Sequence, residues 1–172
     1  GLLGCVALLC TLAACSLSGD EEHKVDVGVW EYFIRDPDPA TATQKMEELT
    51  DAGFRAAITN SFWEPGRREP SAQELAELTS AARAAQAANV RPMLIVQNPG
   101  SGTTPNTAER RAEFAAYAAS IARRLPAFRD FIIGNEPNLN RFWLPQFGPN
   151  GENVAARDYL ALLAESYDAL KA

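Results

Sequence analysis

The feature that most constrains the fold is a regular alternation of short apolar runs and longer helix-like segments. Strand-like runs occupy residues 25–30, 54–60, 90–97 and 131–133. Each is followed by a segment whose apolar residues recur three or four positions apart, which is the spacing of one helix face. Strict alternation of strand and helix predicts an α/β fold with a parallel sheet and right-handed crossovers.

Capping residues indicate where the helices begin. Thr41 and Ser71 are each followed three residues later by Gln or Glu, and Asn106 precedes a third helix in the same way. The fourth helix is expected to start near Asn153, with one apolar face that contains Leu160, Leu163, Tyr167 and Leu170.

Two architectures fit four strand–helix units. One is the first half of a TIM (β/α)8 barrel, and the other is a complete four-stranded, doubly wound sheet. A full barrel needs about 250 residues, whereas this chain has 172 and starts with Gly. The last residues stop within a helical pattern, so we expect a fragment, cut at both ends.

The N-terminal segment has the composition of an export signal. Residues 1–18 are apolar, too short to span a bilayer, and end in small residues. The stretch from Leu12 to Cys15 resembles a bacterial lipobox, which predicts a lipoprotein signal at 1–15, lipidation of Cys15 and a polar tether at 16–24. The alternative is a plain signal peptide cleaved near Ala14. Either way we expect an exported, bacterial-type protein, secreted or anchored at the cell surface.

Composition excludes several functions. The net charge of −6 argues against nucleic acid and against an anionic membrane surface as partners, so membrane contact is expected only through a lipid on Cys15. All three cysteines lie at or before Cys15, and the one histidine is His23. Residues 25–172 therefore have no cysteine zinc site and no histidine-based triad, and we expect no metal and no cofactor.

The fourth apolar run leads directly into a polar cluster. Ile133 is followed by Gly134, and then by Asn135, Glu136 and Pro137. Pro137 cannot donate to a sheet ladder, so Glu136 is expected at the carboxyl end of a buried strand, on the rim where parallel α/β folds bind ligands. A carboxylic acid there suits glycosidic bond cleavage, which needs a proton donor for the leaving oxygen and a second carboxylate.

The run from Gly134 to Pro137 resembles the fourth-strand motif of clan A glycoside hydrolases, the retaining (β/α)8-barrel enzymes that include the family 5 cellulases. The resemblance implies that Glu136 is the general acid/base and that Asn135 holds the sugar's 2-hydroxyl. It also favours the half-barrel, with residues 25–172 as the N-terminal half of a catalytic domain. The alternative is that these residues simply start an ordinary loop.

The chain departs from the family 5 pattern elsewhere. Ile58 and Asn60 stand where the second strand of those cellulases has Arg and Pro, and the third strand ends in Gln97–Asn98 instead of His. The resemblance therefore holds better for the clan than for the family, and it carries no sugar specificity. In the clan the nucleophile is a Glu on the seventh strand, which residues 1–172 do not include.

Further rim residues are expected to bind substrate because amides bond hydroxyl groups and aromatic rings stack on sugar faces. They are Trp30, Asn60, Trp63, Gln97, Asn98, Asn135 and Trp143. Trp30 also fits a core position, and Trp143 also fits a loop anchor. Trp63 precedes a Glu-Pro-Gly turn, which favours the rim. Glu31 and Glu64 are expected to contact substrate or to form loop salt bridges.

The sequence thus predicts a retaining glycoside hydrolase that acts on O-glycosyl bonds of a β-linked polysaccharide or oligosaccharide. We expect residues 1–172 alone to be inactive and to expose an unpaired sheet edge. One alternative is a non-catalytic, carbohydrate-binding lipoprotein on the same scaffold. Another is a small doubly wound binding protein, in which the absence of a glycine-rich phosphate loop after the first strand argues against nucleotide binding. The oligomeric state is not predicted.

Overall fold

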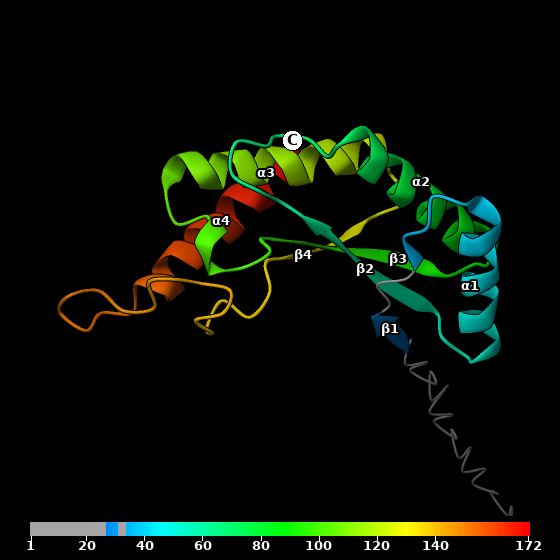
Figure 1. Ribbon diagram of the computed structural model, residues 1–172, viewed down its shortest axis with the longest axis horizontal. Helices are drawn as coiled ribbons and strands as arrows, with labels where there is room; N and C mark the ends of the chain where they lie inside the picture. Colours follow the sequence, from blue (N-terminus) through cyan, green and yellow to red (C-terminus); the bar gives the residue numbers. More distant parts are fainter. Residues whose placement is uncertain (1–26, 31–33) are drawn as a thin grey trace, which may run out of the picture.

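The computed structural model describes residues 27–30 and 34–172 (Figure 1). The predictions for the signal segment 1–15, for lipidation of Cys15, for the tether 16–24 and for Glu31 lie outside these residues. None of the helices in the described part of the chain is long and apolar enough to cross a membrane.

Four strands form one parallel sheet in the order β1-β2-β3-β4. The strands are β1 (Gly28–Trp30), β2 (Ala56–Phe62), β3 (Arg91–Gln97) and β4 (Asp130–Ile133). They alternate with the helices α1 (Pro39–Asp51), α2 (Ala72–Ala87), α3 (Ala108–Arg124) and α4 (Val154–Lys171), and a short 3-10 turn, η2 (Ser101–Thr103), follows β3. The predicted α/β fold of four strand–helix units is confirmed.

Strand order decides between the two architectures. A doubly wound sheet reverses direction at a switch point and carries helices on both faces. Here each strand pairs with the next one in the chain, so right-handed crossovers place every helix on the same face, as in a barrel. Figure 1 shows the four helices arched around one side of the sheet. The structure is therefore the first half of a (β/α)8 barrel.

The core lies between the helices and the sheet. Leu94 and Val96 of β3 are fully buried against Phe114 and Ile121 of α3 and Leu162 of α4. Since side chains alternate along a strand, Ile95, which lies between Leu94 and Val96, and Gln97, which follows Val96, point to the opposite face. We call this opposite face the inner face, because it corresponds to the interior of a barrel. No helix of the described chain covers it.

Two of the four predicted helix starts need correction. Ser71 and Asn153 are N-caps as predicted. Helix α1 is capped instead by Asp38, whose carboxylate accepts hydrogen bonds from the backbone of Ala40 and Thr41 and from the hydroxyl of Thr41. Asp38 precedes a proline that suits the first helical turn. These bonds lower the pKa of the Asp38 carboxyl.

The other correction concerns α3, whose N-cap is Thr107 and not Asn106. The Asn106 side chain donates instead to the Leu144 carbonyl, in the loop after β4. A one-residue shift of this kind cannot be read from local sequence, because the competing partner is far away in the chain.

Helix α4 has two apolar sides. Leu162 and Ser166 are buried toward the sheet, whereas Leu160, Leu163 and Tyr167 are exposed. The face that the sequence pattern singles out is thus mostly the one without a covering element in the described chain. A barrel helix contacts both its own sheet and its neighbouring helices, which explains why both sides are apolar.

Gly134 gives a test of the β4 end. Its φ is +74°, and a Cβ there would lie 3.3 Å from Cε2 of Tyr159. We expect Gly134→Ala to lower the free energy of unfolding by about 1–3 kcal/mol, because both the backbone and the contact become strained. Gly102 has open space around it and no positive φ. Gly102→Ala is therefore the control, expected to change stability by less than about 1 kcal/mol in urea unfolding. Equal effects of the two changes would contradict this description of Gly134.

Candidate functional site

The carboxyl ends of the parallel strands bring five of the predicted site residues to one rim. Trp30 ends β1, Asn60 lies near the end of β2, and Gln97 ends β3. Asn135 and Glu136 follow β4, whose ladder with β3 extends to the bond from the Gly134 amide to the Val96 carbonyl, 2.7 Å. These five residues are spread between positions 30 and 136 of the chain, and the fold brings them to the same end of the sheet. Their roles in binding or catalysis remain predictions.

Glu136 stands in a turn and not in a helix. Its φ is +42°, a left-handed conformation that costs a non-glycine residue about 1–3 kcal/mol unless its surroundings impose it. Its carbonyl accepts a hydrogen bond from the Leu139 amide at 2.9 Å. The residue is exposed, and its carboxylate has no hydrogen-bond or ion-pair partner within the described chain. This leaves the carboxyl group free to meet a ligand.

Trp30 and Asn60 form a pair on the inner face. The Trp30 indole Nε1 donates to Oδ1 of Asn60 at 2.9 Å. The Trp30 side chain is 53% exposed, while Asn60 is only 5% exposed. The bond occupies the acceptor of the Asn60 amide and fixes the orientation of its donor, Nδ2. The pair thus combines an exposed aromatic ring with an oriented hydrogen-bond donor.

Gln97 supplies a buried acceptor on the same face. It is 4% exposed, and its Oε1 has no hydrogen-bond partner. Leaving a buried carbonyl oxygen unpaired costs about 1–3 kcal/mol, so most buried polar atoms have a partner. Oε1 itself has almost no exposed surface, so a bound molecule reaches it only if the Gln97 side chain turns outward.

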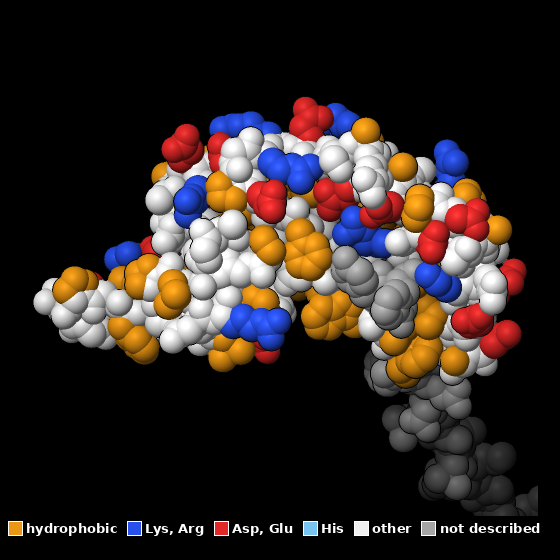
Figure 2. All heavy atoms as spheres, viewed as in Figure 1, with side chains coloured by type: hydrophobic (Ala, Val, Ile, Leu, Met, Phe, Trp, Pro, Cys, Tyr) orange, Lys and Arg blue, Asp and Glu red, His pale blue; other side chains and the backbone are white. Residues whose placement is uncertain are grey.

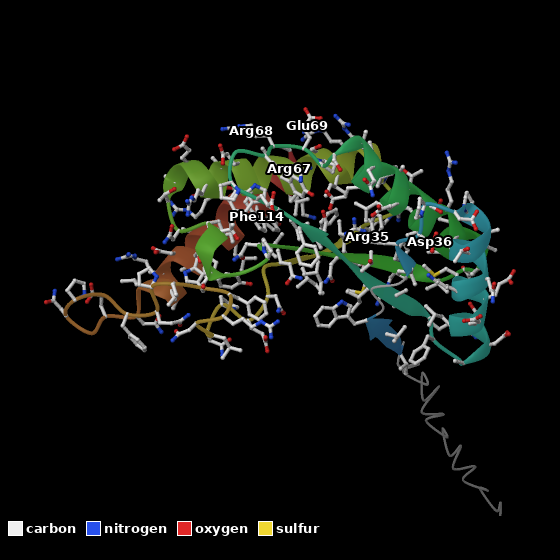
Figure 3. The ribbon with its side chains drawn as sticks, viewed as in Figure 1. Arg35, Asp36, Arg67, Arg68, Glu69 and Phe114 are labelled. Carbon is white, nitrogen blue, oxygen red and sulfur yellow. The ribbon has the colours of Figure 1, made fainter. Side chains whose placement is uncertain are left out.

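An ionic network, absent from the sequence predictions, supports the end of β2. The Arg35 guanidinium donates to the Asn60 carbonyl at 2.7 Å and to the Glu77 carboxylate at 2.8 Å, and it lies 3.7 Å from Glu74. Figure 3 shows Arg35 in the segment after β1 and Arg67 in the segment after β2. These arginines, with Glu74 and Glu77, line a polar cleft of about 330 Å³. Arg35 lies in a stretch that the sequence marks only as loop, so no sequence signal reveals its contacts.

A buried cluster lies beneath this network. The Glu74 carboxylate accepts hydrogen bonds from Ser61 Oγ and from the Tyr117 hydroxyl, both at 2.8 Å. Burial raises the pKa of Tyr117 well above its usual value, so its hydroxyl stays protonated and donates. The cluster ties β2, α2 and α3 together directly behind Asn60. It therefore stabilises the rim and offers no free group to a ligand.

The expectation for Trp63 is corrected. The side chain is fully buried, its ring centroid lies 5.4 Å from that of Phe114, and its Nε1 donates to the Arg67 carbonyl. Alternation along β2 explains this: Ser61 faces the helices, so Trp63 does as well. The turn that follows Trp63 gave a misleading indication, and the ring is not available to stack on a sugar.

Trp143 also lies in the core, where it acts as an anchor for its loop. It is 1% exposed, and its ring meets that of Tyr159 edge-on, with centroids 5.9 Å apart. The structure thus agrees with the alternative of a loop anchor and leaves no face of this ring open to a sugar.

Asn98 connects two loops. Its Nδ2 donates to the carbonyls of Gly100 and Phe142, at 2.8 and 2.9 Å, and the residue is buried. Both amide hydrogens are therefore used between the β3–α3 and β4–α4 loops. Asn98 therefore links the two loops of the rim, and its amide hydrogens are not available to a substrate.

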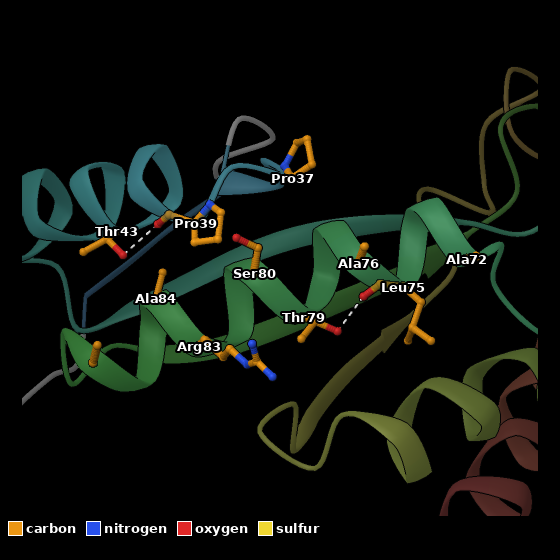
Figure 4. Close-up of a pocket in the computed structure, with 11 residues that line it drawn as sticks. Pro37, Pro39, Thr43, Ala72, Leu75, Ala76, Thr79, Ser80, Arg83 and Ala84 are labelled. Atoms are coloured by element: carbon orange, nitrogen blue, oxygen red, sulfur yellow. Dashed lines mark hydrogen bonds between the residues drawn. The ribbon is translucent and has the colours of Figure 1, made fainter.

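Other surfaces of the described chain are less suited to a site. Figure 2 shows Lys and Arg mixed with Asp and Glu over the helical side, without a large patch of one sign. A groove of about 600 Å³ lies between the start of α1 and α2 (Figure 4). The Thr43 and Thr79 hydroxyls in it donate to carbonyls of their own helices, and it holds no carboxylate and no aromatic ring. Within the described residues no group of three or more His, Cys, Asp or Glu side chains is placed to hold a metal ion.

No family model matches the chain, and no curated protein matches it in sequence. Solved structures do match its fold. A structure described as the apo form of a beta-glucosidase, 1317, superposes with a TM-score of 0.58 at 15% identity, over 77% of this chain and 42% of that one. An AHE enzyme from Alicyclobacillus herbarius gives a TM-score of 0.56 at 19% identity, over 77% of this chain and 34% of that one.

Beta-glucosidase 2 from the fungus Trichoderma reesei, in complex with Tris, gives a TM-score of 0.53 at 17% identity, over 78% of this chain and 34% of that one. At these identities the likeness shows the fold. The chain spans between 34% and 42% of the length of the three structures, in agreement with the first half of a barrel.

Proposed function

We propose that this chain forms the acid/base half of a retaining glycoside hydrolase that cleaves O-glycosyl bonds of a β-linked oligosaccharide or polysaccharide. The observation that carries the proposal is the position of Glu136: an unpaired carboxyl group at the carboxyl end of β4, on the rim that also holds the Trp30–Asn60 pair. Two of the three similar structures are beta-glucosidases, which supports the same class of reaction.

The chemistry assigns two steps to Glu136. Its carboxylic acid first donates a proton to the departing glycosidic oxygen while a second carboxylate attacks the anomeric carbon. The resulting Glu136 carboxylate then takes a proton from a water molecule as the water oxygen attacks the anomeric carbon. The bond between that carbon and the second carboxylate breaks, and the sugar is released. Asn135 precedes Glu136 and is assigned to the sugar's 2-hydroxyl. The nucleophile must lie about 5–5.5 Å from Glu136, and we assign it to a strand outside residues 1–172.

The inner face supplies the contacts for the sugar next to Glu136. The exposed ring of Trp30 stacks on the C–H face of a pyranose, and Nδ2 of Asn60 donates to one of its hydroxyls. The amide of Gln97, whose Oε1 is buried and unpaired, bonds another hydroxyl once its side chain turns toward the sugar. Together these groups bind an uncharged, hydroxylated ring.

A titration tests sugar binding without requiring catalysis. Trp30 is the one exposed tryptophan of the three in the chain, because Trp63 and Trp143 are buried. Adding cellotetraose or mannotetraose to the 172-residue protein is expected to shift the tryptophan emission to shorter wavelength, because the sugar displaces water from the Trp30 ring. The shift should disappear in Trp30→Phe. A shift that persists in this variant, or no shift with any β-linked oligosaccharide, contradicts the proposed binding face.

A second candidate function is carbohydrate binding without hydrolysis. Its support is that the described rim shows no carboxylate that matches a second catalytic group, since Glu64 is exposed in the loop after β2 and does not fit the motif. Sugar binding with no hydrolysis in the protein that carries this sequence, even with activated aryl glycosides, favours this candidate.

We also propose that the protein is exported and anchored through a lipid on Cys15. The lipobox-like end of the apolar segment supports this. Cells that express the full protein with labelled palmitate should incorporate the label, and Cys15→Ser should abolish it. Incorporation that survives this change would exclude Cys15 as the anchor.

A further inference from the structure

The loop that carries Glu136 is closed by one side chain. Nε2 of Gln146 donates to the carbonyls of Pro137 and Trp143, each at 2.9 Å. Pro137 is the residue directly after Glu136, so this bond fixes the Pro137–Asn138 peptide group, which lies one residue beyond the candidate acid. Both hydrogens of the Gln146 side-chain amide are used, so neither is available to another acceptor.

Gln146 is itself held by the backbone. Its backbone carbonyl accepts hydrogen bonds from the backbone amides of Val154 and Ala155, at 3.1 and 3.2 Å, at the first turn of α4. Trp143, the other residue that it bonds, is buried in the core. Gln146 therefore links Pro137 to two fixed parts of the fold, and its half-buried side chain has little freedom to move away.

The chain on the other side of Glu136 is fixed as well. The Tyr159 hydroxyl of α4 donates to the Ile133 carbonyl at 2.8 Å, and its ring lies against Gly134. Glu136 thus lies between two anchored points, Ile133 before it and Pro137 after it. This arrangement accounts for its positive φ, which the surroundings must impose.

We propose that Gln146 is a positioning residue for Glu136. By donating to the Pro137 carbonyl, it sets the direction in which the Glu136 carboxyl group leaves the backbone and so aims its proton at the leaving oxygen. The proposal rests on the proposed function. It assigns a role in the reaction to a residue nine positions beyond the motif that marks the site.

The test compares leaving groups in the full protein that carries this sequence. Gln146→Leu keeps the size of the side chain and removes both donors. The value of kcat/KM reports the first step, cleavage of the glycosidic bond, which needs the proton of Glu136 when the leaving group is poor. For an alkyl or phenyl β-glycoside it is therefore expected to fall about 100-fold, the effect of a displacement of about 1 Å. With a 2,4-dinitrophenyl β-glycoside, whose leaving group needs no proton, kcat/KM should fall less than about 3-fold.

Two further variants complete the design. Gln44→Leu is the matched control, since Gln44 is an exposed glutamine that bonds Glu48 on α1, far from β4 along the sheet, and it should leave both rates unchanged. Gln146→Glu keeps the length but offers a carboxylate that cannot donate, so it should repeat the leaving-group dependence of Gln146→Leu. Circular dichroism shows whether each variant is folded.

The outcomes separate the two claims. If Glu136→Gln shows the leaving-group dependence of a lost acid while both Gln146 variants slow the two substrates equally, Gln146 is not a positioning residue and the proposed function stands. If Glu136→Gln has no such dependence, or the unchanged protein hydrolyses no β-glycoside, the proposed function fails and the role of Gln146 fails with it.

Discussion

Replacing Glu136 with alanine should lower kcat/KM for glycosides with poor leaving groups by about 10²–10⁴-fold, the usual contribution of a general acid. The expected loss is much smaller for 2,4-dinitrophenyl β-glycosides, because that leaving group departs without a proton. Steady-state kinetics on both substrate types, in the full protein, measures the difference. The structure supports this expectation because the Glu136 carboxylate stands unpaired on the rim.

The same variant should respond to azide. With an activated substrate the glycosyl-enzyme still forms, but water attacks it slowly without a general base. Azide needs no base: its terminal nitrogen attacks the anomeric carbon and the enzyme's carboxylate leaves, which gives a β-glycosyl azide with retained configuration. Glu64→Ala is the control, as Glu64 is also an exposed carboxylate after a strand end. An azide response in Glu64→Ala, or none in Glu136→Ala, would assign the acid/base to another residue.

The largest effect on stability is expected at Trp63. Its side chain is fully buried between β2 and α3, in contact with Phe114. Trp63→Ala removes this contact area and leaves a cavity, so the free energy of unfolding should fall by about 3–5 kcal/mol. Urea unfolding of the 172-residue protein, followed by circular dichroism, measures the change.

Trp30→Ala is the matched comparison, because it makes the same change at a half-exposed ring. We expect Trp30→Ala to lower the free energy of unfolding by less than about 1.5 kcal/mol. This is the size of one hydrogen bond, and the Trp30 side chain donates one, to Asn60. Equal losses for the two variants would contradict the assignment of Trp63 to the core and of Trp30 to the open inner face.

The sequence was sufficient for the fold because the fold rests on local patterns. Each strand is a short apolar run and each helix has an apolar repeat, and their alternation leads to a parallel sheet. Sequence left open whether the sheet is barrel-like or doubly wound, since the order of strands is a property of pairing between distant segments. The resemblance around Gly134 to Pro137 favoured the half-barrel, which the strand order β1-β2-β3-β4 confirms.

Single side chains at the site were harder to predict. Counting from Ser61, alternation along β2 places Trp63 on the helix side, but the register of a strand end is not visible when a turn follows it directly. Arg35 and Gln146 were missed for another reason. They bond the backbone carbonyls of Asn60 and Pro137. Every residue has such a carbonyl, so no pattern of residue types indicates these contacts.

Exposed apolar residues accompany the open sheet. Ile132 of β4 is exposed on the inner face, and Leu160, Leu163 and Tyr167 are exposed on α4. In the three similar structures the part that matches this chain is at most 42% of the whole. We expect these surfaces to pack against further strand–helix units in a full barrel, which would also bring the second carboxylate to the rim.

The most direct test is the structure of Glu136→Gln, in the full protein, with an uncleaved β-linked oligosaccharide bound. The account predicts that the side-chain amide at 136 lies within about 3.2 Å of the glycosidic oxygen, the reach of a proton donor, and that the Trp30 ring lies against the adjacent sugar. A sugar bound on the helical side, or bound at the rim with residue 136 turned away from the glycosidic oxygen, would contradict it.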